Sequence, residues 1–209
     1  MKLQIQDANA LIKIEVSQGI RGIIDDIQKR ELCKKAEEKF DVFCVVPCVS
    51  LQQLYGGKIC AALDRQHPRD LFDVKYLLDN EGFTDKIKRG FLFGLLSSKR
   101  PVIEMLFPNW INQEQAYYNQ FVGMTNEAFS YADFESTRAK LIETIHYYLT
   151  EQDKHFIVNF ENATPDWSTY NFAQFPAVKW KLQNIEKLKS SNPSKHDNGI
   201  ILLKQKLKL

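Results

Sequence analysis

The stretch LYGGKICAALDRQHPRDLFDVKYLL, residues 54–78, decides how this chain folds. Its apolar residues recur at helical spacing on both sides of His67-Pro68, a dipeptide that interrupts a helix. Ser50 can cap a helix that runs to about residue 63. Pro68 suits the first turn of a second helix, because the N–H that proline lacks would have no partner there. The stretch therefore predicts two consecutive helices, the second ending near Asp79.

The first predicted helix places basic side chains on one face. That face, with residues three or four positions apart, consists of Tyr55, Lys58, Ala62 and Arg65. The side chains expected to reach the core are Leu51, Leu54, Ile59 and Ala61. Gly56 and Gly57 are unexpected inside a helix, because each glycine costs about 1 kcal/mol relative to alanine. Either a neighbouring group approaches the backbone closely there, or the helix begins later.

The second predicted helix carries two carboxylates on one face. Asp70 and Asp73 are three residues apart, so they repel each other unless a cation lies beside them. Arg69, Lys58 or a metal ion could be that cation. In a purely structural interpretation, Asp70 favours the helix dipole and Asp73 pairs with Arg69. In a functional one, the carboxylates hold Mg²⁺ and Lys58 binds a triphosphate, which serves phosphoryl or nucleotidyl transfer.

Strands are expected only near the start of the chain. Residues 11–17, LIKIEVS, alternate apolar and polar side chains, which indicates a strand. A second strand is predicted over residues 41–49, where Pro47 marks its end or an edge. Residues 25–39 fit either a short charged helix or a loop. Two strands alone make a marginal sheet, so they need further strands or a helical cover.

Beyond residue 50 the pattern is helical. Thr84 can cap a third helix, and further helices are predicted over residues 133–149, 152–161, 176–189 and 200–209. Hydrophobic residues make up 44% of the chain and charged residues 26%, which is ordinary for a globular protein. The sequence has no long apolar run that would indicate a membrane span or a secretory signal. We therefore expect a cytoplasmic protein without a membrane partner, whose four cysteines are reduced.

The net charge of +2 is unevenly distributed. Residues 177–209 hold 8 basic and 2 acidic residues, a net charge of +6, whereas residues 110–176 hold 3 basic and 9 acidic residues, a net charge of −6. The basic tail could contact a phosphate backbone. A solvated lysine-rich helix face is the other interpretation.

The segment KICAALDRQHPRDLFDV, residues 58–74, resembles the shared core of the AbiEii/AbiGii toxin family. These are nucleotidyltransferase-like proteins of bacterial type IV toxin–antitoxin and phage-defence systems. The residues that match the family pattern are Lys58, Ala61, Arg65, Arg69, Asp70 and Asp73. The segment FPAVKWKLQNIEKL, residues 175–188, also resembles the closing region of many members.

The resemblance implies an α+β fold. Residues 1–50 would form part of a polymerase-β-like nucleotidyltransferase sheet, and residues 51–209 a predominantly helical domain with basic C-terminal helices. It also implies Mg²⁺-dependent transfer of a nucleotide from a nucleoside triphosphate to an acceptor such as the 3′ end of tRNA, and an antitoxin as partner. The implied catalytic residues are Lys58, Asp70 and Asp73, and the implied nucleotide-binding residues are Lys58, Arg65 and Arg69.

One further site residue follows from the resemblance. Glu15 lies on the polar face of IKIEV, where such folds often place a third, metal-binding carboxylate. An outward-facing strand glutamate is the alternative interpretation.

The family's upstream motif is missing from this sequence. Members carry a Gly-Ser or Gly-Gly-Thr turn followed by an Asp-x-Asp pair, and neither precedes LIKIEVS here. Asp25 and Asp26 are adjacent, so on a strand their side chains would point to opposite faces. We therefore expect an N-terminally truncated member. Two hypotheses remain: an incomplete nucleotidyltransferase toxin, or a non-catalytic helical module that binds an antitoxin or RNA.

Overall fold

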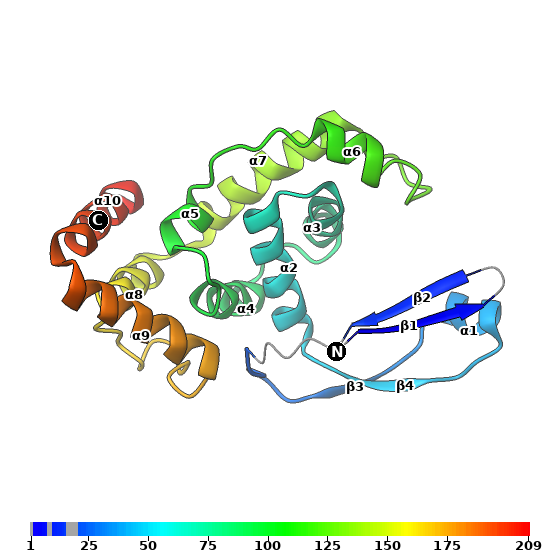
Figure 1. Ribbon diagram of the computed structural model, residues 1–209, viewed down its shortest axis with the longest axis horizontal. Helices are drawn as coiled ribbons and strands as arrows, with labels where there is room; N and C mark the ends of the chain where they lie inside the picture. The colour runs from blue at the N-terminus through cyan, green and yellow to red at the C-terminus, as the bar shows by residue number, and fades with distance from the viewer. Residues whose placement is uncertain (1, 8–9, 16–20) are drawn as a thin grey trace.

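The computed structural model describes residues 2–7, 10–15 and 21–209, which form small N-terminal hairpins followed by a mostly helical part (Figure 1). The strands and the helix of the hairpin part are β1 (Lys2–Asp7), β2 (Ala10–Glu15), β3 (Gln28–Glu31), α1 (Lys34–Phe40) and β4 (Val45–Cys48). The helical part consists of α2 (Leu51–Arg65), α3 (Pro68–Asn80), α4 (Asp85–Leu96), α5 (Val102–Leu106), α6 (Glu114–Gln120), α7 (Tyr131–Tyr148), α8 (Glu151–Glu161), α9 (Pro176–Ser191) and α10 (Pro193–Leu207). The chain is thus a mixed α+β protein, as expected.

The four strands form two separate antiparallel pairs, β1 with β2 and β3 with β4. The two predicted strands, residues 11–17 and 41–49, are present as β2 and as the shorter β4. Val16 and Ser17 lie outside the described residues, and residues 41–44 are not part of a strand. The partner strands β1 and β3 were not predicted, and β3 and α1 occupy the region where a helix or loop was expected. Pro47 lies opposite Lys29, which is tolerated because both strands of a two-stranded ladder are edges.

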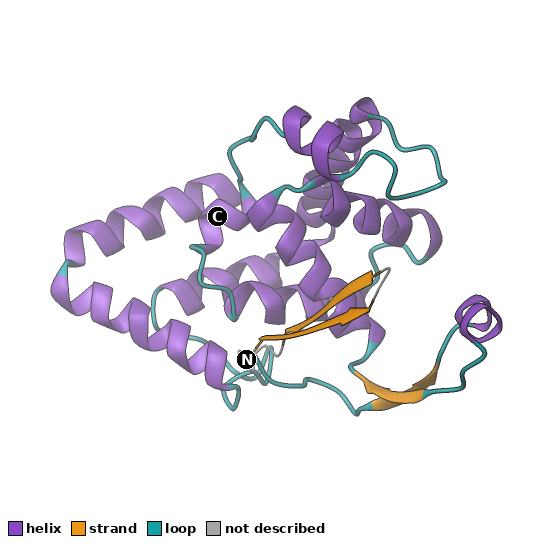
Figure 2. Ribbon diagram, turned by 45° about the vertical axis from the view of Figure 1, so that its right-hand side comes forward, coloured by secondary structure: helices purple, strands orange, loops and turns teal. Residues whose placement is uncertain are grey.

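The hairpin part adds little to the hydrophobic core. Large apolar side chains are exposed on both hairpins, with Leu11 at 62% and Phe43 at 72% of full exposure. Among the described residues, the fully buried apolar side chains all belong to the chain from Ile59 onward. Figure 2 shows the strands beside the helices rather than between them. The helices therefore form the rigid framework of the molecule.

Helices α2 and α4 cross with their backbones almost in contact. A Cβ atom added to Gly56 would lie 2.2 Å from the carbonyl carbon of Gly90, and one added to Gly90 would lie 2.0 Å from the carbonyl oxygen of Gln52. One helical turn later, a Cβ on Gly94 would lie 2.7 Å from the sulfur of Cys60. Gly57, by contrast, faces open space. Close approach of a second backbone therefore explains Gly56, and the helix does not begin late.

The segment before β3 is fastened to the start of α2. The Gln53 side-chain amide donates to the Gly22 carbonyl at 2.7 Å, and the Ser50 hydroxyl donates to Asp25 at 2.6 Å. Ser50 also caps α2, as predicted, by accepting from the Gln53 N–H. Burial raises the pKa of Asp25, but the hydrogen bond from Ser50 and the charge of Arg89, 2.8 Å away, outweigh this and lower it. The two parts of the chain are therefore joined by a partly buried polar contact.

The remaining helices follow the predicted order. Thr84 caps α4, and α7, α8 and α9 lie where the sequence pattern placed them. Helix α10 begins earlier than predicted, because Pro193 occupies its first turn and Asn192 caps it. Helices α9 and α10 form an antiparallel pair at the end of the molecule opposite the hairpins (Figure 1). Among the described residues, no helix is long and apolar enough to cross a membrane.

Substitution of the adjacent glycines of α2 tests the close helix contact. Gly56→Ala should lower the free energy of unfolding by more than about 2 kcal/mol, because the new methyl group would overlap the α4 backbone. Gly57→Ala should raise the free energy of unfolding by up to about 1 kcal/mol, because alanine favours the helix and its methyl group would have no other group within 4 Å. Urea unfolding of both variants measures the difference. Equal effects would contradict the close contact.

Asp153 should make the stability depend on pH. Burial raises the pKa of this carboxyl, but hydrogen bonds from Tyr170, Lys88 and Thr150 outweigh burial and lower it below the ordinary value of about 3.9. The ionised form is therefore favoured by folding. Its stabilisation is complete above the unfolded-state pKa and is lost as the pH falls through the folded-state pKa.

Asp153→Asn tests this network. The variant should be less stable at pH 7 by about 3 kcal/mol, because the buried Lys88, 2.9 Å from Asp153, would keep only the exposed Asp85, 3.2 Å away, as a carboxylate partner. It should also lose less stability than the wild type between pH 5 and pH 2. Thermal unfolding across this range measures both effects, and an unchanged slope would speak against the assignment.

Candidate functional site

A cavity of about 430 Å³ lies where α2, α3 and α4 meet the segment before β3. The residues that line it are Arg21, Val49, Gln53, Leu54, Gly57, Lys58, Ala61, Arg65, Asp70, Asp73, Gly90, Phe93 and Gly94. We call it the central cavity. It brings together four of the residues singled out by the sequence pattern, namely Lys58, Arg65, Asp70 and Asp73.

Two ion pairs cross the central cavity from α2 to α3. Lys58 Nζ lies 2.5 Å from an oxygen of Asp73, and Arg65 Nη2 lies 2.7 Å from an oxygen of Asp70. The Lys58 and Asp73 side chains are 37% and 44% exposed, so solvent and ligands can reach them. Each of the two carboxylates therefore has its own basic side chain beside it, Lys58 for Asp73 and Arg65 for Asp70. Asp73 pairs with Lys58 rather than with Arg69, in contrast to the structural interpretation of the sequence.

Local sequence explains why these side chains meet. His67 accepts from the Arg69 N–H and caps α3, and Pro68 occupies its first turn, so the chain reverses sharply between the two helices. Asp70 then lies in the first turn of α3, where its charge also favours the helix dipole. This turn brings the end of α2 close to the beginning of α3, where Arg65 reaches Asp70.

The face of α2 differs from the prediction at Leu54, Ala61 and Ala62. Ala61 lines the cavity between Lys58 and Arg65, whereas Ala62 is buried in the core. Leu54, predicted to be a core residue, is 43% exposed and borders the cavity. The helix is therefore rotated slightly relative to the predicted face, because Gly56 rather than Leu54 makes its contact with α4.

Two predicted site residues lie outside the central cavity. Arg69 borders a second hollow on the neighbouring face of α3. Glu15 lies on β2, about half exposed, and pairs with Lys2 at 3.3 Å and with Lys13 at 2.7 Å. The structure thus assembles Lys58, Arg65 and the two aspartates, and it places Arg69 and Glu15 elsewhere.

The carboxylates of the cavity do not form a site for a divalent cation. No group of three or more His, Cys, Asp or Glu side chains within residues 2–7, 10–15 and 21–209 is arranged to hold a metal ion. Asp70 and Asp73, the two carboxylates of the central cavity, each face a basic side chain. The cavity therefore fits an anion better than Mg²⁺ in the arrangement seen here.

Several residues of the cavity were not found by sequence reasoning. Arg21 adds a third basic side chain, from the segment that Gln53 fastens to α2. No local pattern marks Arg21, because only the fold brings it to α2. Gly90 and Gly94 of α4 form the opposite wall. Gly90 and Gly94 are four residues apart, and this spacing could have indicated a close helix contact, since small residues one turn apart let two helices approach closely.

The C-terminal helices carry a second concentration of positive charge. The lysines of residues 177–209 that are not buried are Lys179, Lys187, Lys189, Lys195, Lys204, Lys206 and Lys208. None of them pairs with a carboxylate in the part of the chain that the structure describes. Trp180 is 49% exposed beside them on α9. This surface resembles a binding face for polyanions.

The comparison with known proteins gives one match. The family model described as Nucleotidyl transferase AbiEii toxin, Type IV TA system, matches residues 1–184, from the N-terminus into α9. No curated protein and no solved structure matches the chain.

Proposed function

Because the chain belongs to the AbiEii family of nucleotidyltransferase toxins of type IV toxin–antitoxin systems, we propose that its central cavity binds a nucleoside triphosphate. The protein would then transfer the nucleoside monophosphate to an acceptor such as tRNA. The observation that carries this proposal is the convergence of Arg21, Lys58 and Arg65 on one cavity. Three basic side chains suit a triphosphate, which carries several negative charges.

The ion pairs of the cavity leave room for such a ligand. Both ion pairs are partly exposed, and exposed ion pairs typically contribute only about 0–1 kcal/mol to the stability of the folded protein. A triphosphate can therefore draw Lys58 away from Asp73 and Arg65 away from Asp70 at little cost. Gly57, which presents no side chain, lets a phosphate approach the α2 backbone. Ligand binding would thus exchange internal ion pairs for contacts with phosphate.

The same exchange would supply the groups needed for transfer. An acceptor hydroxyl oxygen forms a bond to the α-phosphorus, and the bond from that phosphorus to the bridging oxygen breaks, so pyrophosphate leaves. Asp73, once released from Lys58, takes the hydroxyl proton, and Asp70, once released from Arg65, helps to shape the site. Lys58 and Arg65 offset the charge that develops on the phosphates. Family membership leads us to expect Mg²⁺ as cofactor, but the described carboxylates do not fit it, so these steps use the chain's own residues alone.

The hairpin part also enters the proposal. We propose that residues 1–50 correspond to part of a polymerase-β-like nucleotidyltransferase sheet and that residues 51–209 form the helical domain. The exposed apolar side chains of the hairpins, such as Leu11 and Phe43, support this, because further strands would cover them. Glu15 would come near the nucleotide only in such an extended sheet. An antitoxin partner and a cytoplasmic location follow from the same family context.

Two lysines in similar ion pairs test the proposed donor site. Lys58→Ala should strongly weaken binding of labelled ATP or GTP and lower transfer to tRNA by at least about 100-fold, because Lys58 supplies one of the three positive charges proposed to face the phosphates. Lys75→Ala is the matched control: Lys75 forms a 2.5 Å pair with Asp79 on α3, outside the cavity. Equilibrium binding and incorporation of α-labelled nucleotide are the measurements. Wild-type nucleotide binding by Lys58→Ala would exclude the proposal.

A non-catalytic RNA-binding module is the second candidate function. It is favoured by the lysines of α9 and α10, which have no carboxylate partners within the described chain. In this case the protein would bind tRNA with a strong dependence on salt and would show no nucleotide affinity.

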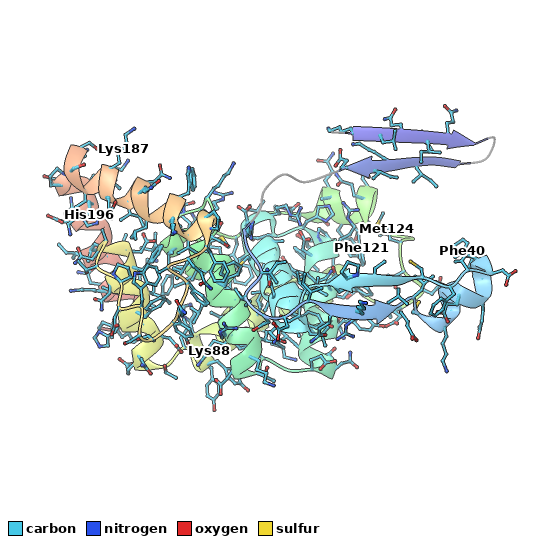
Figure 3. All side chains as sticks on the ribbon, turned by 90° about the horizontal axis from the view of Figure 1, so that it is seen from below. Phe40, Lys88, Phe121, Met124, Lys187 and His196 are labelled. Atoms are coloured by element: carbon cyan, nitrogen blue, oxygen red, sulfur yellow. The ribbon has the colours of Figure 1, made fainter. Side chains whose placement is uncertain are left out.

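Charge reversal on α9 tests the second candidate. Lys179→Glu combined with Lys187→Glu should weaken tRNA binding and reduce the slope of log K against log salt by about 1 for each phosphate that the protein no longer neutralises. The control combines Lys34→Glu with Lys35→Glu, which makes the same charge change on exposed residues of α1. Lys187 lies on the outer surface of the C-terminal helices (Figure 3). If both double variants weaken binding equally, α9 is not a specific binding surface.

A further inference from the structure

The second cavity, about 460 Å³ in volume, lies beside the central one. Its walls come from α3 and from the turn that follows α6, and they consist of Arg69, Phe72, Asp73, Phe121, Met124 and Thr125. We call it the lateral cavity. Phe121 and Met124 lie close together (Figure 3), and the Met124 N–H donates to the Phe121 carbonyl. The family resemblance implies roles for Arg69 and Asp73, but it assigns no role to the cavity itself.

The floor of the lateral cavity is aromatic and fixed in place. The ring centroid of Phe72 lies 5.5 Å from that of Phe121 and 5.4 Å from that of Phe129. Phe121 and Phe129 are buried, so this cluster cannot rotate freely. Met124, 60% exposed, stands at the mouth. Such walls suit a flat, apolar ring, because bases stack on aromatic side chains without regard to sequence.

One basic side chain accompanies this apolar floor. The Arg69 side chain is exposed and forms no ion pair within the described residues. The central cavity, by contrast, has three basic side chains on its wall, Arg21, Lys58 and Arg65. A single guanidinium matches the single charge of a phosphodiester, whereas three cations match a triphosphate. The two cavities therefore differ in the charge of the ligand that they suit.

Asp73 connects the two cavities. Among the described residues it is the one that lines both, and its carboxylate holds Lys58 at 2.5 Å. A hydroxyl group bound at the inner end of the lateral cavity would therefore reach the carboxylate that faces the central one. This is the arrangement that an acceptor needs, since its oxygen must meet both the base and the α-phosphorus.

We propose that the lateral cavity binds the 3′-terminal nucleotide of an RNA acceptor. The base packs against Phe72 and Met124, the last phosphodiester meets Arg69, and the terminal hydroxyl points toward Asp73. This inference rests on the proposed function, because it assigns the acceptor side of the same reaction. A free nucleoside triphosphate in this cavity is the competing occupant that the experiment must exclude.

The test compares two neighbouring positions in the same turn. Met124→Glu places a carboxylate at the mouth of the lateral cavity, whereas Val122→Glu adds the same charge at a residue that is 58% exposed and does not line it. Fluorescence anisotropy measures the affinity of the full chain for a labelled single-stranded oligoribonucleotide with a free 3′ end, at physiological salt, where screening over about 8 Å limits general charge effects. ATP binding is measured in parallel.

Met124→Glu should weaken oligonucleotide binding by about tenfold or more, and Val122→Glu by less than about threefold. Arg69→Ala, an exposed change that leaves the core intact, should weaken it by about fivefold or more, and Arg69→Lys should restore part of the affinity. A circular oligonucleotide of the same sequence should bind more weakly than the linear one. ATP affinity should be unchanged in all four variants.

Three results would overturn the inference. These are equal effects of the two glutamate variants, equal binding of the circular and linear oligonucleotides, and a weaker ATP affinity in Met124→Glu. Failure of the proposed donor site is recognised separately, because it appears as normal ATP binding by Lys58→Ala. The oligonucleotide measurements involve no nucleoside triphosphate, so the two failures are distinguishable.

Discussion

The close crossing of α2 and α4 is the constraint on which the remainder of the structure depends. Gly56 and Gly90 let the two backbones approach until no side chain fits between them, and Gly94, one turn later, leaves room for the Cys60 sulfur. This contact fixes the rotation of α2 about its own axis. Lys58 and Arg65 then point away from α4, toward α3, and Gly57 opens onto the central cavity. The backbone contact at Gly56 and Gly90 thus determines where the charged side chains lie.

The second determinant is the sharp reversal between α2 and α3. His67 and Pro68 end one helix and begin the next, so the basic end of α2 faces the acidic first turns of α3. Two ion pairs result, and both remain accessible to solvent. Their accessibility matters for function, because a fully buried pair would resist exchange with a phosphate ligand. The helices thus hold four charged groups in an arrangement that a polyanion can rearrange.

Much of this arrangement could be predicted from the sequence, and the reasons are local. The caps at Ser50 and Thr84 and the proline at the start of α3 act within a few residues, so they can be identified in the sequence. The convergence of Lys58, Arg65, Asp70 and Asp73 followed from helical spacing and from the family resemblance.

What could not be predicted depends on contacts between distant segments. Arg21 reaches the central cavity only because Gln53 binds the chain at Gly22, thirty-one positions away. The pairing of Asp73 with Lys58 rather than Arg69 depends on the rotation of α2, which the glycine contact sets. Strand β3 was missed because its QKRE sequence has no apolar alternation and it is held only by β4.

The hydrophobic core lies in the helical part, and this affects how each part of the molecule unfolds locally. The described residues of the hairpins contribute no fully buried apolar side chain, and their strands lie in ladders of two. Their amide protons should therefore exchange with solvent through local opening, at rates set by each hairpin alone. Amides of α2 and α4 at the glycine crossing should exchange only when the whole helical part unfolds. The boundary between these two regimes falls at the hydrogen bond between Asp25 and the buried Ser50.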